Sequence, residues 1–224
     1  MNSDLWILAL HTTTPSLGLA LWPLSAHKSA QVSEQGIPRH QSWWLDRELA
    51  AQLHPLLQAW LPPQTWAGLA AIAVATGPGS FTGCRLGVTV ARTLGQTLHL
   101  PVFGVSSLAA LAQQYFRQQP TTSPTPLAVS MDAQRGEYYG GIYQWDPITH
   151  HLHTTVADQL WTAAAWQTCL ADQGNPPVQE APTSPATPPT LGVAEWAARA
   201  YQQGSRPAWQ GVLPTYLRRP PIHS

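Results

Sequence analysis

The chain has 224 residues, of which only 10% are charged, and its 11 Lys and Arg balance its 11 Asp and Glu. Proteins that bind nucleic acid by themselves usually carry a basic face, because neutralising phosphates supplies most of their affinity. The composition therefore argues against such a binder. The two cysteines, Cys84 and Cys169, lie far apart, which favours a reducing compartment over a disulfide framework. The N-terminal segment lacks the positive charge of a signal peptide and no run reaches membrane-spanning length, so we expect a cytoplasmic protein that does not enter a membrane.

The first part of the chain predicts strands followed by an amphipathic helix. Residues 5–10 and 17–22 are apolar runs joined by a turn-rich segment, and a third strand is expected around residues 30–34. From Ser42, a suitable N-cap, apolar residues recur every three or four positions as far as Leu61. This spacing predicts a helix that starts close to Ser42.

Strands and helices alternate in the rest of the chain. We expect strands at 69–75, 101–105, 127–131 and 137–145. We expect helices at 108–116 and 192–202, and a helix after residues 77–83 that includes the amphipathic run 89–98. The segment 172–190 is rich in proline and too polar to bury much surface, so it should form a flexible loop. This order of elements predicts a mixed α/β architecture.

The most distinctive segment is a glycine-rich turn at the start of a helix. It consists of Gly77, Pro78, Gly79, Ser80, Phe81, Thr82 and Gly83. Glycines let the backbone turn sharply, and free N–H groups at a helix start can cradle an anion. No Lys follows Gly83, as a Walker loop requires, and the third glycine comes one residue too late for the dinucleotide fingerprint. The turn is therefore either an anion cradle or a structural pivot, and the pivot is more frequent in α/β domains.

Small residues recur every four positions along the helix that follows this turn. They are Gly83, Gly87, Ala91 and Gly95, which we call the small-residue stripe. Its two interior glycines forfeit roughly 2 kcal/mol of helix propensity, and close approach of another backbone is the usual compensation. The stripe packs either on the protein's own sheet or against a helix of another chain. Trp43, Trp44 and Trp60, assigned to the preceding helix, favour the second interpretation, because aromatic residues are enriched at interfaces.

The histidines and carboxylates form no recognisable site. None of the nine histidines gives the His-x-x-x-His spacing of a helical zinc site, and His151 and His153 have no further ligand at suitable spacing. Asp132 is the best polar candidate, because it follows a predicted strand and lies near Arg135 and Glu137, yet Asp is also a common turn residue. We therefore expect no metal ion and no catalytic residues.

With these motifs in view, the chain resembles the TsaB family, the dimerisation subunits of the bacterial tRNA threonylcarbamoyladenosine machinery. The resemblance covers residues 1–145 well, and beyond them only the tail. It rests on the opening strand and turn at 7–14, the glycine signature at 77–87, the segment 105–108, the Asp-Ala-Gln-Arg-Gly-Glu-Tyr-Tyr stretch at 132–139 and the Pro-Thr-Tyr-Leu-Arg tail at 214–218.

The resemblance implies a two-lobed α/β fold of the actin/Hsp70-like (ASKHA, ribonuclease H-like) class, with mixed sheets flanked by helices and a reduced second lobe. Residues 1–106 would form the N-terminal lobe with the dimerisation helices, and residues 107–224 the C-terminal lobe. His11 stands where related proteins often place an Asp that serves the phosphates and the metal. The resemblance therefore implies no cofactor of the chain's own, so that ATP or ADP would bind only at a complex interface.

The implied role is that of a non-catalytic scaffold, which binds and activates TsaD for threonylcarbamoyl transfer to N6 of adenosine 37 in tRNA. The implied partners are a TsaD-like paralogue and a TsaE-like ATPase, with a homodimer when the chain is alone and tRNA contacted only indirectly. The interface would lie on the first two helices, at Trp44, Leu45, Leu49, Leu53, Gly83, Gly87, Ala91 and Gly95. The alternative is a metal-independent hydrolase, a glycoprotease-like peptidase or a nucleotide hydrolase, with Ser80 or Thr82 of the glycine turn as nucleophile.

Overall fold

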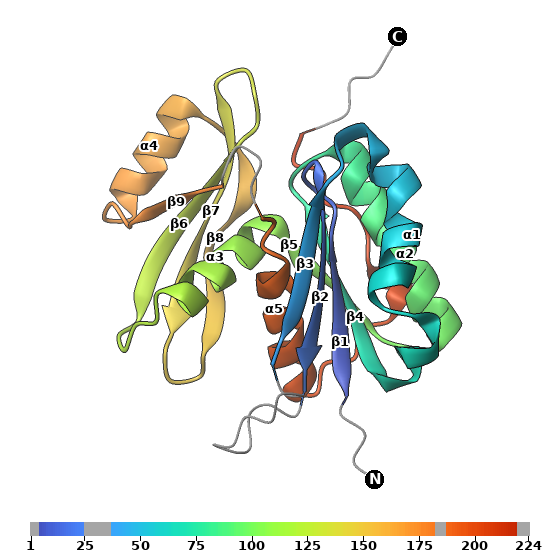
Figure 1. The fold of residues 1–224 in the computed structure, drawn as a ribbon. Helices are drawn as coiled ribbons and strands as arrows, with labels where there is room; N and C mark the ends of the chain where they lie inside the picture. Colours follow the sequence, from blue (N-terminus) through green and yellow to red (C-terminus); the bar gives the residue numbers. More distant parts are fainter. Residues whose placement is uncertain (1–4, 25–36, 182–186, 219–224) are drawn as a thin grey trace.

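The computed structural model describes residues 5–24, 37–181 and 187–218, which form two lobes that are each built on a sheet (Figure 1). The sheet of the first lobe has the strand order β3-β2-β1-β4-β5. Its strands are β1 (Trp6–His11), β2 (Ser16–Pro23), β3 (Arg39–Trp44), β4 (Leu69–Gly77) and β5 (Val102–Ser106). Strand β1 pairs antiparallel with β2 and parallel with β4, so the sheet is mixed.

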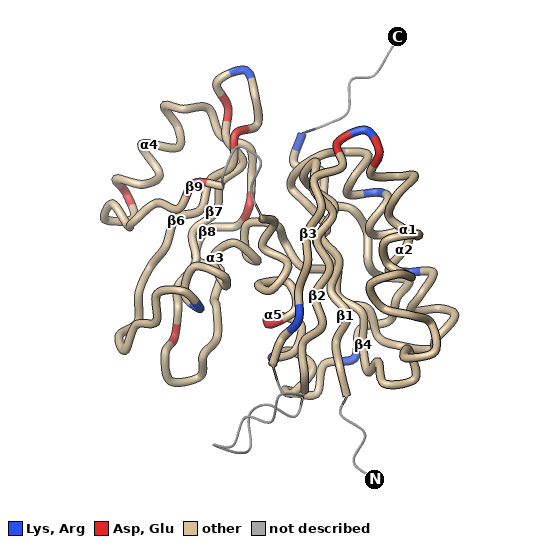
Figure 2. The backbone as a smooth tube through the Cα atoms, viewed as in Figure 1, with Lys and Arg blue, Asp and Glu red and all other residues tan. Residues whose placement is uncertain are grey.

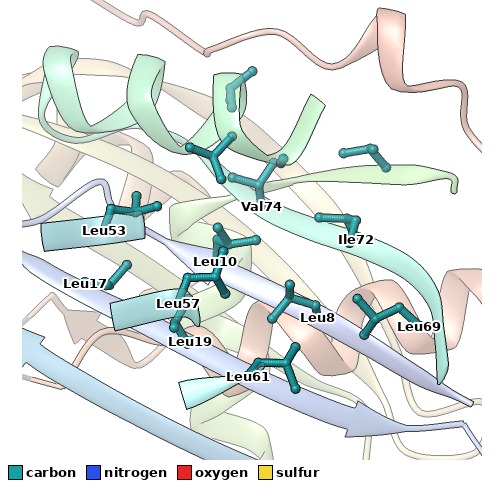
Figure 3. Packing of buried hydrophobic residues seen from close by; sticks show 14 of the residues in the cluster. Leu8, Leu10, Leu17, Leu19, Leu53, Leu57, Leu61, Leu69, Ile72 and Val74 are labelled. Atoms are coloured by element: carbon teal, nitrogen blue, oxygen red, sulfur yellow. The ribbon is translucent and has the colours of Figure 1, made fainter. Parts of the chain in front are cut away.

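Helices cover both faces of the first sheet, which explains why its central strands are apolar without interruption. Helices α1 (Leu49–Trp60) and α2 (Phe81–Leu98) lie on one face, and α5 (Thr190–Gln202) lies on the other (Figure 1). Because side chains alternate along a strand, Leu8 and Leu10 of β1 pack toward α1 and α2, whereas Ile7 and Ala9 pack toward α5. Figure 3 shows the leucines of α1 against those of β1 and β2.

The second lobe is a four-stranded sheet with the order β8-β7-β6-β9. Its strands are β6 (Thr125–Asp132), β7 (Glu137–Asp146), β8 (His151–Thr162) and β9 (Val178–Glu180). Helix α3 (Ser107–Gln118) packs on one face and α4 (Ala163–Asp172) on the other. The expected mixed α/β architecture, with two sheets flanked by helices, is confirmed.

The expected start of the first helix was wrong. Ser42 and Trp44 belong to strand β3, which pairs antiparallel with β2, and α1 begins only at Leu49. A short 3-10 helix, η2 (Asp46–Glu48), separates the two elements. Adjacent residues of a strand point to opposite faces, so Trp43 packs on the α1 side while Trp44 lines the space between the lobes. The third strand expected around residues 30–34 lies outside the described residues.

The chain returns to the first lobe near its C-terminus. Helix α5 covers the first sheet, and the tail follows it, since the backbone N–H of Thr215 donates to Thr76 O at 2.8 Å. The chain first leaves the N-terminal sheet at Ser106, where β5 ends. The division into lobes of residues 1–106 and 107–224 remains a proposal. The predicted loop at 172–190 contains the short strand β9 within its described part. No helix in the described ranges is both long and apolar enough to span a membrane.

A half-buried carboxylate ties the two lobes together. Asp158 of β8 accepts hydrogen bonds from the Tyr143 hydroxyl of β7 and from the Ser106 hydroxyl at the end of β5. The Ser106 oxygen also accepts from the backbone N–H groups of Leu108 and Ala109, at 3.1 and 3.2 Å, and so caps α3. Burial raises the pKa of the Asp158 carboxyl. The cap of α3 and the second sheet are therefore linked through one side chain.

An Asp158→Ala variant is expected to lower the free energy of unfolding by about 1–3 kcal/mol, because it leaves the buried Tyr143 hydroxyl without its partner. Asp172→Ala is the matched control: Asp172 is exposed at the end of α4, and its loss should change stability by no more than about 0.5 kcal/mol. Urea denaturation measures both variants. Equal midpoints for them would contradict the linking role of Asp158.

Candidate functional site

A cleft of about 470 Å³ lies between the two lobes. The turn between β1 and β2, the glycine turn and the start of α3 supply its first-lobe wall. The hairpin of β6 and β7 supplies the opposite wall. The segment before α5 also lines the cleft, and it lies against β2, since a Cβ on Gly18 would be 2.7 Å from Pro188 Cγ. The residues that line the cleft include His11, Thr13, Trp44, Ser80, Ser107, Met131, Asp132, Tyr139, Pro188 and Arg218.

His11 occupies the end of β1 and is fully buried. Its Nε2 lies 3.2 Å from Thr13 Oγ1, which in turn lies 3.0 Å from Ser107 Oγ. Its Nδ1 has no hydrogen-bond partner among the described residues. Burial lowers the pKa of His11 to about 3, so the ring is neutral at pH 7. A neutral imidazole supplies no positive charge to a phosphate.

The depressed pKa of His11 makes stability depend on pH. The unfolded imidazole takes up a proton near pH 6.5, whereas the folded one does so only near pH 3. The unfolded state therefore binds more protons between these values, and stability is lost as pH falls from about 6.5 toward 3. We expect wild type to lose about 2 kcal/mol more than His11→Gln between pH 7 and pH 5. Urea denaturation at both pH values tests this, and identical pH dependence of the two proteins would contradict it.

The glycine turn packs closely on the turn between β1 and β2. The backbone N–H of Ser80 donates to Thr13 O at 2.7 Å, and the Ser80 hydroxyl oxygen accepts from the Gly83 N–H at 3.2 Å, which caps α2. A Cβ atom on Gly79 would lie 2.3 Å from Thr13 O, and one on Gly83 would lie 1.9 Å from Thr12 O. These glycines allow one turn to pack on another, which supports the structural interpretation.

The small-residue stripe faces the interior of its own lobe. All of its residues are buried. A Cβ atom on Gly87 would lie 2.2 Å from Thr12 Oγ1, and one on Gly95 would lie 2.2 Å from Val102 Cγ2. The expectation that this stripe presents a face to another chain was wrong, because the protein's own β1 turn and β5 cover it. Periodicity identified the face correctly but gave no information about what packs on it.

The other residues expected at the interface are not on an exposed helix face either. Leu49 and Leu53 of α1 are buried, and Leu45 packs against the same core. Trp44 is 49% exposed, but it lies in β3 and lines the cleft. Trp44 was expected at the interface, but in the structure it lines the cleft.

The outward faces of α1 and α2 carry little charge. Helix α1 contains no Asp, Glu, Lys or Arg, and α2 contains only Arg85 and Arg92. Figure 2 shows this pair of helices largely in tan. Apart from Arg85 on α2, the exposed residues are not Asp, Glu, Lys or Arg: they are Ala50, Ala51, Gln52, His54, Pro55, Gln58 and Ala59 on α1, and Phe81, Thr82, Thr89, Thr93, Gln96 and Thr97 on α2. We call these residues the outer helix face. Charged residues are depleted in the same way at the cores of protein interfaces.

The residues considered for hydrolysis are not assembled into a catalytic group. The Ser80 oxygen caps α2, and no hydrogen bond joins its side chain to a base within the described ranges. Asp132 is exposed and accepts from the Gln134 N–H at 2.7 Å, as turn residues do. The rings of His151 and His153 are 4.6 Å apart. In the portion of the chain that the structure covers, no group of three or more His, Cys, Asp or Glu could hold a metal ion.

Comparison with known proteins identifies the family. The family model described as TsaD: tRNA N6-adenosine threonylcarbamoyltransferase matches residues 46–182. The tRNA threonylcarbamoyladenosine biosynthesis protein TsaB of Bacillus subtilis is 33% identical over 76% of this chain and 68% of its own length. The chain belongs to the TsaB family. The Escherichia coli TsaB is 32% identical over 62% of the chain, and the match covers 55% of the Escherichia coli protein.

A solved structure of the same fold supports this membership. A Pseudomonas aeruginosa protein with similarity to the peptidase YEAZ is 27% identical and superposes with a TM-score of 0.70. The superposition covers 96% of this chain and 100% of that one. The TsaB resemblance inferred from the motifs is thus confirmed.

Proposed function

We propose that this TsaB-family chain is a non-catalytic scaffold in tRNA threonylcarbamoyladenosine synthesis. It binds a TsaD-like partner through the outer helix face and activates that partner for threonylcarbamoyl transfer to N6 of adenosine 37. The observation that carries the proposal is the outer helix face itself, an exposed and nearly uncharged surface on two adjacent helices. A free chain would form a homodimer through the same face.

The interior of the cleft supports a role without catalysis. Its deepest titratable group, His11, is neutral and hydrogen-bonded to a threonine. Phosphoryl transfer needs positive charge or a metal ion beside the phosphates. A neutral imidazole at position 11 supplies neither the positive charge nor the oxygen ligands that Mg²⁺ prefers. ATP or ADP would then bind only at an interface with the partner or with a TsaE-like ATPase. The balanced charge of the chain favours indirect contact with tRNA, because a direct binder normally carries a basic face. We propose a cytoplasmic location.

Reconstitution tests this function. Threonylcarbamoyladenosine formed in tRNA would be measured with the TsaD-like partner, the TsaE-like ATPase and a threonylcarbamoyl donor, with and without this chain. We expect modification only when the chain is present, and equal yields in its absence would contradict the proposal.

The second candidate function is hydrolysis, because the solved Pseudomonas aeruginosa relative is described by its similarity to a peptidase. Purified chain that hydrolyses a peptide or nucleotide, and loses this activity on Ser80→Ala, would favour that candidate over the scaffold. A matched Thr93→Ala variant on the outer helix face controls for unrelated loss of activity.

A further inference from the structure

The cleft has large apolar side chains on both of its walls. Met131 and Tyr139 are cross-strand partners on β6 and β7, so their side chains lie next to each other on the second lobe. Trp44 of β3 lines the cleft from the first lobe, with 49% of its surface exposed. Pro188 adds a further apolar ring. Aromatic side chains placed in this way bind flat rings by stacking.

The inner end of the cleft offers neutral hydrogen-bonding groups. Thr13 Oγ1 and Ser107 Oγ are 3.0 Å apart, and both residues are buried. His11 Nδ1 is buried without a partner in the described part of the chain. Each hydroxyl group can both donate and accept a hydrogen bond, so this end of the cleft favours a ligand that can do both.

The charges at the cleft do not favour an anionic ligand. Of the described residues that line it, only Asp132 and Arg218 are charged. Arg218 is bound by the Glu137 carboxylate, and Asp132 accepts from the Gln134 N–H. No unpaired cation is thus left in this lining to neutralise a phosphate, which is the role that Arg and Lys normally serve.

We infer that the cleft binds an uncharged nucleoside-like molecule, with a heteroaromatic ring against Trp44 and hydroxyl groups at the Thr13 and Ser107 end. The volume of about 470 Å³ is within the range of small-molecule sites. This site lies apart from the outer helix face, so it goes beyond the proposed scaffold role and does not depend on it.

Isothermal titration of the full chain tests the inference with adenosine, guanosine, cytidine and uridine, and with the 5′-triphosphate of each. We expect at least one nucleoside to bind with a Kd below about 1 mM and its triphosphate to bind at least tenfold more weakly. No binding by any nucleoside would overturn the inference. A triphosphate that binds as tightly as its nucleoside would overturn it too.

Two neighbouring tryptophans provide matched variants. Trp44→Ala should weaken nucleoside binding about tenfold, the typical loss for one stacked base, whereas Trp43→Ala, on the opposite side of β3, should leave it unchanged. Circular dichroism would establish that both variants are folded at the titration temperature. Equal affinities for the two variants would contradict the placement of the ring.

Association with the TsaD-like partner, measured on the same Trp44→Ala protein, should remain at the wild-type level. This result separates the nucleoside site from the scaffold proposal.

Discussion

A Gly83→Ala variant is expected to lose about 3 kcal/mol or more of unfolding free energy. The added Cβ would lie 1.9 Å from the backbone oxygen of Thr12, and a backbone atom has no rotamer by which to move away. Overpacking typically costs about 1–3 kcal/mol of unfolding free energy. A clash with a backbone atom should cost as much as the upper value or more. Since domains have only about 5–15 kcal/mol of stability, the shift in urea midpoint should be large.

Thr89→Ala is the matched control for Gly83→Ala. Thr89 lies on the same helix but is exposed on the outer helix face. Its replacement should change stability by no more than about 0.5 kcal/mol, because alanine is a better helix former and no contact is lost. If both variants unfold at the same urea concentration, the close packing of the glycine turn on Thr12 is contradicted.

An Ala51→Glu variant is expected to weaken association with the TsaD-like partner at least 30-fold. Ala51 lies on the uncharged outer helix face, where a carboxylate would be buried without a partner in the complex. Such a charge costs roughly 2 kcal/mol or more at an interface, and about 2 kcal/mol corresponds to a 30-fold change in Kd. Titration calorimetry or surface plasmon resonance measures the change.

Ala164→Glu is the control for this variant, since Ala164 is also exposed and lies on α4 of the second lobe. Its Kd should remain within a factor of about two of wild type. Equal weakening by both substitutions would indicate a general effect of charge rather than a docking site. Larger substitutions in the stripe, such as Gly87→Leu, are poor tests of association, because a Cβ at Gly87 already meets Thr12 Oγ1 at 2.2 Å and would disturb the fold itself.

Four strands of the first lobe and the glycine turn were predictable because their signals are local, whereas β8 and β9 were not predicted. Strands β1, β2, β4 and β5 are apolar runs, and Ser80 is an N-cap at a glycine-rich helix start. Strand β3 was missed because Ser42 is also a suitable N-cap and Trp44 fits the helical spacing. What decided the conformation was pairing with β2, and residues far apart in the sequence make that pairing.

The cleft could not be found from the sequence for a similar reason. Thr13, Ser107 and Tyr139 come from three distant segments, and only the folded chain brings them to one cavity. The importance of His11 was visible from its position in the opening motif, but its unpartnered Nδ1 depends on burial by the whole lobe. The periodicity of the stripe likewise predicted a face and left open which neighbour covers it.

The most direct test of the scaffold account is size-exclusion chromatography with light scattering, on this chain alone and mixed with its TsaD-like partner. The account predicts a homodimer for the chain alone, which exchanges into a one-to-one mixed complex when the partner is added. Ala51→Glu should abolish this exchange and Ala164→Glu should preserve it. A chain that remains monomeric and elutes separately from the partner would contradict the account.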